Sequence, residues 1–448
     1  MKVCVIGTGY VGLVTGVCLA EIGNTVLCVD KNKDKINMLR SGKVPIYEEG
    51  LEELVKKNTR SGNLIFNEDT AYGIRESDIV FICVGTPPLS SGKPDLSAID
   101  EVAMLIGKSI NGYKIISNKS TVPIGTAKRI KKIIKENQND AGNGYEFDIV
   151  SNPEFLKEGE AVKDAFFPER IVIGSESKKA IELISELYEP IIKQDFDYAL
   201  NNTHKKDTIP VLITDSTSSE LIKYASNAFL ASKISFINEV ANLCERVGAN
   251  ILDVTHGMGL DSRIGSRFMK AGIGWGGSCF PKDARALSYT AEEYGSPASI
   301  LNAVIQVNNQ QRFKVIQKAV NMLGIIEDKI IGVLGLSFKP GTDDTREAPS
   351  VAIINKFLEL GAEVRVYDPI VKEYPEDMDR SAIMVSDPYR AIERANLMVL
   401  VTEWDEFYSL DFERVKSLMS GLNIIDGRNI FDKEKLNKSG FNYTGIGY

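Results

Sequence analysis

A glycine-rich turn between a strand pattern and a helix pattern, near the start of the chain, is the feature that most restricts its fold. Gly7-Thr8-Gly9-Tyr10-Val11-Gly12 follows the apolar run Val3–Ile6, and a second apolar run, Thr25–Val29, leads to Asp30. In a dinucleotide-binding unit the first glycine makes a tight turn, the second admits a pyrophosphate and the third lets the helix pack closely, while the acid binds ribose hydroxyls. The acid would repel a 2′-phosphate, so the motif favours NAD over NADP. We therefore expect Gly7, Gly9, Gly12 and Asp30 at an NAD site.

The same alternation of strand and helix signals runs through both halves of the chain. Further strand-like runs of the first half are Ile79–Val84, Lys114–Ser117, Asp148–Ser151 and Arg170–Ile173. The pattern returns in the second half at Ile330–Leu336, Glu363–Asp368, Leu397–Thr402 and Asn423–Asp426. Alternating βα units imply parallel sheets covered by helices on both faces. The predicted fold class is α/β, with two Rossmann-like, doubly wound domains.

A long helix is predicted between these two domains. From Ser218 to Gly248 apolar residues recur at helical spacing, and no glycine or proline interrupts them. About thirty residues at about 1.5 Å each give a helix of about 45 Å, which is long enough to join domains. Helical patterns continue from Ala284 to Met322, and the polar stretch Asn201–Asp207 is typical of a linker. The predicted domains are residues 1–205 (NAD-binding), 206–325 (helical, for dimerisation) and 326–448 (Rossmann-like).

Charge and composition exclude several classes of protein. A net charge of −8 lacks the basic footprint of a nucleic-acid-binding protein. No apolar run has the length of a membrane span, and the strand pattern at Lys2 leaves no room for a signal peptide, so we expect a cytoplasmic protein without a membrane partner. The six cysteines form no CxxC pair and there are only two histidines, so neither a disulfide framework nor a metal site is expected.

Cys279 lies in the most unusual segment, Gly274-Trp275-Gly276-Gly277-Ser278-Cys279-Phe280-Pro281-Lys282-Asp283. The glycines remove bulk around the thiol, and Pro281 is typical of a helix start. A helix dipole and the nearby Lys282 would both favour the thiolate. In a nicotinamide enzyme, a nucleophilic cysteine indicates an aldehyde trapped as a thioester, and thus oxidation to an acid.

Acid–base chemistry must come from groups other than histidine, because His204 lies in the linker and we interpret His256 as a loop residue. Glu154 and Glu158 are four residues apart and would share a face on a helical turn; a solvated acidic turn is the alternative. Lys223 and Asn227 have the same spacing on the long helix, where a lysine reaching to solvent is the alternative. Asp283 would lie one helical turn from Cys279, or serve only as a first-turn helix acid.

Two further groups of residues point to ligands. Thr86 and Thr121 follow strands of the first sheet, at the edge where a nicotinamide would lie, although Thr86 also suits a plain turn. In the second domain Phe338–Arg346 replaces the glycine-rich turn and carries Lys339 and Arg346, and Arg428 follows the strand Asn423–Asp426. Such a turn is an anion site, which suggests a nucleotide carried by the substrate; a structural basic loop is the alternative.

These segments, in this order and over nearly the whole chain, resemble the UDP-glucose 6-dehydrogenase family of nucleotide-sugar dehydrogenases. The segments that carry the resemblance are the Gly7 motif, Lys119–Pro123, Asn152–Leu156, Lys223–Phe229, the Cys279 loop and Asp344–Glu347. The resemblance implies oxidation of the C6 alcohol of UDP-glucose to a carboxylate, with two NAD⁺ consumed. It also implies a homodimer or larger homo-oligomer, because Arg263 resembles a residue that reaches into the neighbouring subunit's site.

The resemblance assigns roles residue by residue. Cys279 is implied as the nucleophile, with Lys223, Asn227, Asp283, Glu154 and Thr121 handling charge, protons and water. The residues implied at NAD include Tyr10, Val11, Asp30, Lys35, Thr86, Thr121, Glu158, Lys282 and Arg346. Those implied at the UDP-sugar are Glu154, Phe155, Leu156, Lys157, Glu158, Lys223, Asn227, Arg263, Phe268, Met269, Lys270, Ala271, Gly272, Gly276, Phe338, Lys339 and Arg428.

Three alternatives remain open at this point. The same chemistry on GDP-mannose or a UDP-N-acetylhexosamine would differ by a few sugar contacts. A two-electron hydroxyacid dehydrogenase would have no need of Cys279 or of the second Rossmann-like domain. An NAD-binding regulator without activity would leave Lys223, Asn227, Cys279 and Asp283 unexplained.

Overall fold

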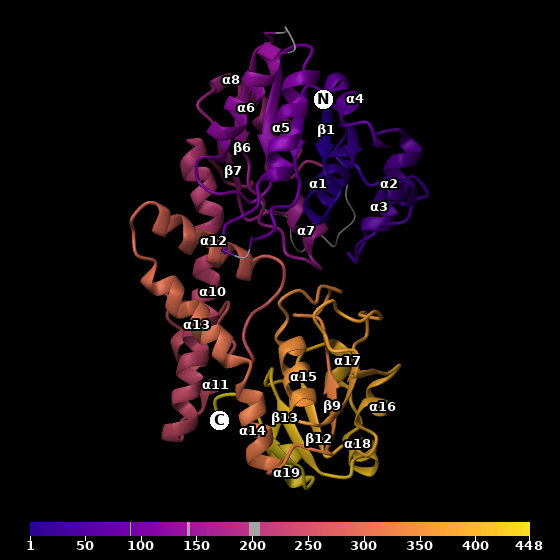
Figure 1. Cartoon of the computed structure of the whole chain (residues 1–448), viewed down its shortest axis with the longest axis vertical. Coiled ribbons are helices and arrows are strands. Elements are labelled where there is room, and N and C mark those ends of the chain that lie inside the picture. Colours follow the sequence, from indigo (N-terminus) through magenta and orange to yellow (C-terminus); the bar gives the residue numbers. More distant parts are fainter. Residues whose placement is uncertain (90, 141–143, 197–206) are drawn as a thin grey trace. The chain divides into compact units, whose positions relative to one another are not determined.

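The computed structural model describes residues 1–89, 91–140, 144–196 and 207–448 (Figure 1). The predicted linker, Asn201–Asp207, lies outside the described residues except for Asp207. The chain divides into two compact units, Met1–Ser226 and Asn227–Tyr448. No helix of the described ranges is both long enough and apolar enough to cross a membrane.

In the described part of the first unit, eight strands form one sheet in the order β3-β2-β1-β4-β5-β6-β7-β8. Their bounds are β1 Lys2–Ile6, β2 Thr25–Val29, β3 Leu64–Asn67, β4 Ile79–Ile82, β5 Lys114–Asn118, β6 Phe147–Ser151, β7 Ile171–Gly174 and β8 Val211–Thr214. Neighbouring strands are parallel except β6 and β7, which pair antiparallel. The predicted parallel sheet is thus confirmed with one exception, while β3 and β8 were not predicted.

Helices cover both faces of this sheet, which is why its strands are apolar on both sides. Residues Val3 and Val5 face α1 (Tyr10–Glu21), α3 (Leu51–Ser61) and α7 (Ala161–Phe166), whereas Cys4 and Ile6 face α4 (Thr70–Glu76), α5 (Ser97–Ser109) and α6 (Thr126–Asp140). The other helices before β8 are α2 (Lys33–Arg40), α8 (Lys178–Leu187) and α9 (Glu189–Lys193). Cys4, Cys18, Cys28 and Cys83 are buried in these cores, where burial raises the pKa of each thiol.

The predicted long helix is α10, Ser216–Val247, and its 32 residues cross the boundary between the units. The helices that follow are α11 Ile251–Gly259, α12 Phe280–Glu293, α13 Ser299–Gln311 and α14 Lys314–Leu323. His256 lies exposed within α11, so the prediction of a loop residue there was wrong. Asn250 explains the helix start, because its side chain accepts a hydrogen bond from Leu252 N.

The second unit contains a sheet of six strands among its described residues, in the order β11-β10-β9-β12-β13-β14, all parallel. The strands are β9 Ile330–Leu334, β10 Glu363–Tyr367, β11 Ile383–Met384, β12 Leu397–Leu400, β13 Asn423–Asp426 and β14 Asn442–Thr444. One face packs on α14 and α15 (Pro349–Glu359), and the other on α16 (Pro388–Ile392), α17 (Asp405–Tyr408), α18 (Phe412–Leu418) and α19 (Lys433–Lys438). The second Rossmann-like unit is therefore confirmed, with β11 and β14 in addition to the predicted strands.

Candidate active site

The turn after β1 has the shape that a dinucleotide requires. Gly7 has φ of +95°, and a Cβ there would lie 2.8 Å from the Cys83 carbonyl oxygen. A Cβ on Gly9 would meet no atom within 4 Å, and no side chain caps the start of α1. The first N–H groups of a helix have no partner within the helix, so those of α1 remain available for a pyrophosphate. The residues here fit NAD.

Asp30, at the end of β2, lies next to this turn. Its Oδ2 accepts hydrogen bonds from Thr8 N at 2.9 Å and Thr8 Oγ1 at 2.8 Å, and Lys35 Nζ lies 3.4 Å away. Burial acts to raise the pKa of Asp30, but the hydrogen bonds from Asn32 and Thr8 and the charge of Lys35 lower it below its ordinary value. Asp30 is thus an anion held beside the turn, as ribose recognition requires.

The loops after β4 and β5 are tied together at the carboxyl edge of the sheet. Thr86 Oγ1 donates to the Thr121 carbonyl oxygen at 2.8 Å, and Ser120 Oγ donates to the Val84 carbonyl oxygen at 2.7 Å. The structure therefore brings Thr86 and Thr121 together on the side of the sheet where the cofactor turn lies. Their contact with the cofactor stays a prediction.

Glu154 and Lys223 form a buried ion pair. Glu154 Oε1 lies 2.8 Å from Lys223 Nζ, and the two side chains are only 6% and 4% exposed. Burial acts to raise the pKa of Glu154, but Lys223, a hydrogen bond from Leu156 N and the charge of Lys119 together lower it. Glu154 is therefore a carboxylate, and neither of the surface alternatives for Glu154 and Lys223 applies.

The segment around Glu154 is not a helical turn. Asn152–Lys157 has no regular secondary structure and α7 begins only at Ala161, so the prediction that Glu154 and Glu158 share a helical face was wrong. The backbone is instead turned by Glu154 itself, whose Oε2 accepts a hydrogen bond from Leu156 N at 2.7 Å. Lys157 points to solvent and pairs with Glu160 and Asp164.

Phe155 lies between two cations. The Arg170 guanidinium carbon is 3.7 Å from the centroid of the Phe155 ring, and Lys223 Nζ is 5.4 Å from it. Arg170 Nη2 also donates to Ser226 Oγ at 3.4 Å. These contacts fix the segment after β6 against α10 next to the Glu154–Lys223 pair.

In the second unit, Cys279 is the residue that precedes α12. Pro281 lies in the first helical turn, and Asp283 N donates to the Cys279 carbonyl oxygen at 2.9 Å. Ser278 Oγ lies 3.5 Å from Cys279 Sγ. The predicted placement of the thiol at a helix start is confirmed, and it is the half-buried one among the six cysteines, the other five being buried.

Asp283 contacts two other predicted site residues, Asn227 and Lys282. It is fully buried, its Oδ2 accepts from Asn227 Nδ2 at 2.6 Å, and its Oδ1 lies 2.5 Å from Lys282 Nζ. The structure thus brings Asn227, Lys282 and Asp283 together one turn after the thiol. Asp283 does lie in the first turn of α12, as the alternative of a first-turn helix acid has it, and it is in addition buried and ion-paired.

Arg428 connects the predicted nucleotide-binding segments of the second unit. Its guanidinium donates to the carbonyl oxygens of Val401 at 2.8 Å, Phe338 at 3.1 Å and Gly274 at 3.4 Å. Lys339 Nζ lies 5.7 Å from the centroid of the Phe338 ring, and Gly277 N donates to the Arg346 carbonyl oxygen at 2.9 Å. The basic turn after β9 therefore lies against the cysteine loop.

Glycines allow this close approach. A Cβ on Gly276 would lie 2.5 Å from the Glu347 carbonyl oxygen, and one on Gly272 would lie 2.8 Å from the Gly427 carbonyl oxygen. Met269 and Ala271 are buried, while Phe268 packs against Phe280 with ring centroids 6.4 Å apart. The segment Phe268–Gly272 thus lines the same loop cluster, with Lys270 exposed.

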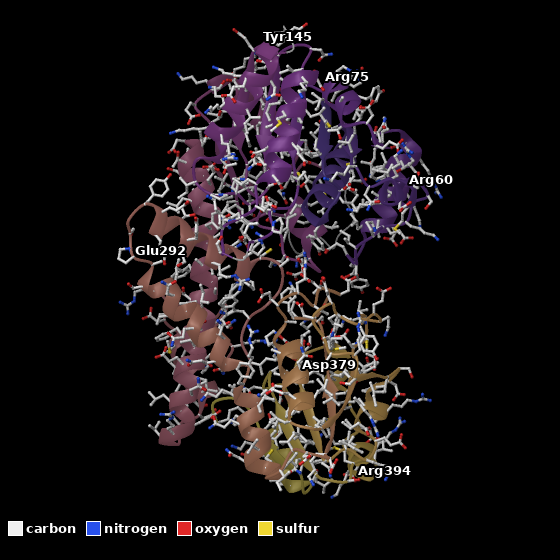
Figure 2. The ribbon with its side chains drawn as sticks, viewed as in Figure 1. Arg60, Arg75, Tyr145, Glu292, Asp379 and Arg394 are labelled. Atoms are coloured by element: carbon white, nitrogen blue, oxygen red, sulfur yellow. The ribbon has the colours of Figure 1, made fainter. Side chains whose placement is uncertain are left out.

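Arg263 and Arg346 are the site predictions that lie far out on the surface of their unit. The Arg263 side chain is 87% exposed and pairs with Asp261, and that of Arg346 is 68% exposed and pairs with Asp344. Figure 2 labels two other exposed arginines, Arg60 in the first unit and Arg394 in the second. The ligand contacts of Arg263 and Arg346 stay predictions.

Three residues beside the site were not predicted. Glu48 accepts hydrogen bonds from Tyr10 Oη, from Gly159 N at 2.8 Å and from Ala161 N at 2.6 Å. Arg170 and Glu220 are the other two. Glu220 had a readable signal, because Glu220, Lys223 and Asn227 repeat at spacings of three and four on a mostly apolar helix. Glu48 had none, since its partners are far away in the sequence, Tyr10 by 38 residues and Gly159 and Ala161 by more than 100.

Three segments of the chain match the domains of one family. Residues 1–192 match the NAD binding domain of the UDP-glucose/GDP-mannose dehydrogenase family, residues 217–310 its central domain and residues 332–433 its UDP binding domain. The UDP-glucose 6-dehydrogenase TuaD of Bacillus subtilis is 46% identical over 100% of this chain and 93% of its own length. The UDP-glucose 6-dehydrogenase of Rhizobium meliloti is 44% identical over 100% and 99%.

Solved structures agree with these sequence matches. A UDP-glucose dehydrogenase of Pyrobaculum islandicum superposes with a TM-score of 0.89 at 36% identity, covering 100% of this chain and 98% of that one. A UDP-D-ManNAc dehydrogenase of Pyrococcus horikoshii reaches 0.86 at 27% identity, covering 100% and 99%. Because three domains of one family match along the chain and relatives are 44–46% identical over its full length, the chain belongs to the UDP-glucose/GDP-mannose dehydrogenase family.

Proposed function

We propose that this protein is an NAD-dependent UDP-glucose 6-dehydrogenase that oxidises the C6 alcohol of UDP-glucose to a carboxylate. The observation that carries the proposal is Cys279 at the start of α12, one turn before the buried Asp283–Asn227 pair. This arrangement supplies a nucleophile with a charged, hydrogen-bonded group beside it. The relatives named UDP-glucose 6-dehydrogenase, at 44–46% identity over the full chain, support this sugar.

NAD, when bound, accepts a hydride from the C6 carbon in each of two oxidations. In the first, a base of the site takes the hydroxyl proton and the aldehyde forms. The Cys279 sulfur then adds to the aldehyde carbon, and oxidation of that thiohemiacetal gives a thioester. Water attacks the thioester carbon, the C–S bond breaks, and the thiol and the sugar carboxylate are released.

Side chains of the protein are needed in these steps for acid–base catalysis and for stabilising charge. We assign Lys223, Asn227 and Asp283 to stabilising the alkoxide charge and transferring its protons. Lys223 and Asp283 are buried ionisable groups, each with an ion-pair partner, and Asn227 is hydrogen-bonded to Asp283. We assign Glu154 to the water that hydrolyses the thioester, since its pKa lies below the ordinary value and it stays a carboxylate. Thr121 and Thr86 would position the nicotinamide end of NAD.

The test counts NADH formed per UDP-glucose consumed by the purified protein. A ratio of two supports the full oxidation, a ratio of one indicates that the reaction stops at the aldehyde, and no NADH contradicts the proposal for this sugar. GDP-mannose and UDP-N-acetylmannosamine, run in parallel, identify the sugar if UDP-glucose fails. A hydroxyacid dehydrogenase would give one NADH with a hydroxyacid and none with any of these.

Cys279→Ser tests the covalent step. We expect steady-state turnover to fall by more than about 100-fold, because a serine hydroxyl is a much weaker nucleophile at neutral pH. The affinity for NAD, measured by fluorescence titration, should stay at the wild-type value. Buried Cys244→Ser is the matched control, and full activity in Cys279→Ser would refute the thioester.

The protein is further proposed to act as a cytoplasmic homodimer or larger homo-oligomer. Four apolar side chains on α10, Phe229, Phe236, Leu243 and Val247, are 55–67% exposed in the isolated chain. Exposed apolar residues seven apart on one helix are typical of a helix that packs against another. A second copy of the same chain is the partner that the family resemblance implies.

A further inference from the structure

Glu220 connects α10 to the loop before α6, and the proposed chemistry requires these two parts of the first unit at a fixed distance from each other. Its Oε2 accepts a hydrogen bond from Gly125 N at 2.6 Å, and its Oε1 accepts one from Ala127 N at 2.7 Å. The residue is only 3% exposed. These N–H groups lie at the start of α6, where a helix leaves its donors without internal partners. One carboxylate on α10 therefore fastens the loop Ser120–Gly125.

The fastened loop carries Thr121, and the helix that fastens it carries Lys223. The Thr121 carbonyl oxygen accepts from Thr86 Oγ1 at 2.8 Å, so the restraint extends to the loop after β4. Glu220 precedes Lys223 by three residues and so shares a face of α10 with it. Lys223 in turn holds Glu154 at 2.8 Å. Glu220 thus links the loop that carries Thr121, at the proposed cofactor site, to the helix that carries Lys223, a proposed acid–base group.

We propose that Glu220 is a positioning residue for the oxidation, which holds the Thr121 loop at a fixed distance from Lys223 and Glu154. The inference rests on the proposed function, because that function is what gives Thr121, Lys223 and Glu154 their roles. A carboxylate suits the task since its two oxygens accept two converging N–H groups. An amide has one acceptor oxygen, and its NH₂ would face the second N–H without bonding to it.

The charge of Glu220 changes near neutral pH. Burial raises the pKa of its carboxyl to about 7, against the hydrogen bonds from Ala127 and Gly125. Among neighbouring charges, Glu176 acts to raise this pKa and Lys128 to lower it, while Lys223 on the same helix is paired with Glu154. Protonation converts one acceptor oxygen into a hydroxyl and so weakens the contact with α6. A pH profile therefore reports on this contact and not on folding alone.

Glu220→Gln is the main test, with Glu239→Gln, an exposed glutamate on the same helix, as the control. We expect kcat of Glu220→Gln to fall about 10- to 100-fold, the range that a small misplacement of catalytic groups produces. The KM for UDP-glucose and the Kd for UDP should stay within about threefold. The acidic limb of the wild-type kcat profile near pH 7 should disappear in Glu220→Gln and persist in the control.

Glu220→Asp keeps both oxygens on a shorter side chain, so its kcat should lie between those of wild type and Glu220→Gln. Hydrogen exchange of peptides covering Ser120–Ala127 should be faster in Glu220→Gln than in the control, and this readout needs no substrate. Unchanged exchange, or a kcat within about threefold of wild type, would overturn the proposal. An equal loss of kcat and UDP affinity would also overturn it, because that pattern indicates general unfolding. Absence of NADH with the wild-type protein would contradict the proposed function alone, and the exchange experiment would still decide the role of Glu220.

Discussion

The ion pair between Glu154 and Lys223 places two opposite charges where almost no water reaches them. Burying either ion alone is costly, and its partner offsets that cost only while both are present. The local structure therefore depends on this pair for folding, the chemistry proposed for Glu154 and Lys223 depends on it as well, and the two contributions can be separated by substitution.

Lys223→Met is expected to lower the free energy of unfolding by about 3–5 kcal/mol, because it leaves Glu154 as a buried unpaired charge. The double variant Lys223→Met/Glu154→Gln carries no unpaired charge and should recover most of that loss. Both variants should be inactive in the NADH assay. Chemical denaturation measures the stabilities, and a double variant as unstable as Lys223→Met would show that the pair is not the source of the effect.

Arg428 offers a second prediction at this scale. Three of its contacts are to backbone carbonyl oxygens of different segments, a geometry that the planar fork of arginine permits and a lysine does not. Arg428→Lys should weaken UDP binding about 10-fold by loosening the basic turn after β9. Isothermal titration with UDP measures this, with exposed Arg394→Lys as the control (Figure 2). Equal affinities in the two variants would contradict a role for Arg428 in the nucleotide site.

At the scale of elements, the acidic residue after the second strand has different contacts in the two sheets. Asp30 and Asp368 both follow the second strand of their sheet. Asp368 is 2% exposed, and its oxygens accept from the backbone N of Leu336, Ser337, Ile370 and Val371 and from the Trp404 indole. An acid with its acceptors filled in this way has no capacity left for a ribose. The nucleotide proposed for the second turn would therefore be held by basic side chains and not by this acid.

The elements that sequence predicted well are those whose signals are local. The turn from Gly7 to Gly12 defines β1, α1 and β2 because a side chain on Gly7 or Gly12 would clash with nearby backbone of that unit, while Gly9 leaves the approach to the turn open. Strand β3 was missed since it lies at the edge of its sheet with Ile65 exposed, and β11 was missed since it has only two residues. The antiparallel β7 carries the same apolar run as a parallel strand, so its direction has no sequence signature.

In the candidate site, too, residues with a local sequence signal were predicted and residues placed by distant contacts were not. The Cys279 loop was recognised from its glycines and its place before Pro281, and Lys223 and Asn227 of α10 from their spacing, whereas Glu220 on the same helix was missed. The nonhelical path of Asn152–Lys157 was not recognised, because it depends on a hydrogen bond from Leu156 N to the Glu154 side chain. Glu48 was missed for a similar reason, as the contacts that bury it come from Gly159 and Ala161.

The packing of α10 against α6 predicts how stability changes with pH. The folded-state pKa of Glu220, about 7, lies above its ordinary value of 4.5, so the protonated form favours folding. The contribution is present at pH below 4.5 and is lost as the pH rises through 7. Ionisation strengthens the contact with α6 but costs folding free energy.

The stability of wild type relative to Glu220→Gln should therefore fall by roughly 1–2 kcal/mol from pH 5.5 to pH 8.5. Thermal unfolding of both proteins across this range measures the difference. Glu239→Gln should show no such trend relative to wild type. A constant difference between wild type and Glu220→Gln would mean that the pKa of Glu220 is not raised in the folded protein.

At the scale of the whole molecule, the proposed association of copies is tested through the exposed apolar residues of α10. Phe229, Phe236 and Leu243 are spaced by seven residues and are 67%, 55% and 57% exposed. A strip of this kind in water favours burial against an equivalent strip on a second chain. Arg263 is exposed in the isolated chain, which leaves it available to a partner.

Phe236→Glu is expected to convert the proposed dimer into a monomer, because an ionised carboxylate at the centre of the strip cannot be buried without a partner. Light scattering coupled to gel filtration at micromolar concentration measures the mass against the 49.4 kDa of one chain. Ile65→Glu, which also replaces an exposed apolar residue but lies on β3, should leave the mass unchanged.

If Arg263 reaches a partner's site, Phe236→Glu and Arg263→Ala should raise the KM for UDP-glucose to a similar extent, and the double variant should add little, since both remove the same contact. A wild-type protein that runs at the mass of one chain, with an unchanged KM in Arg263→Ala, would rule out the shared site.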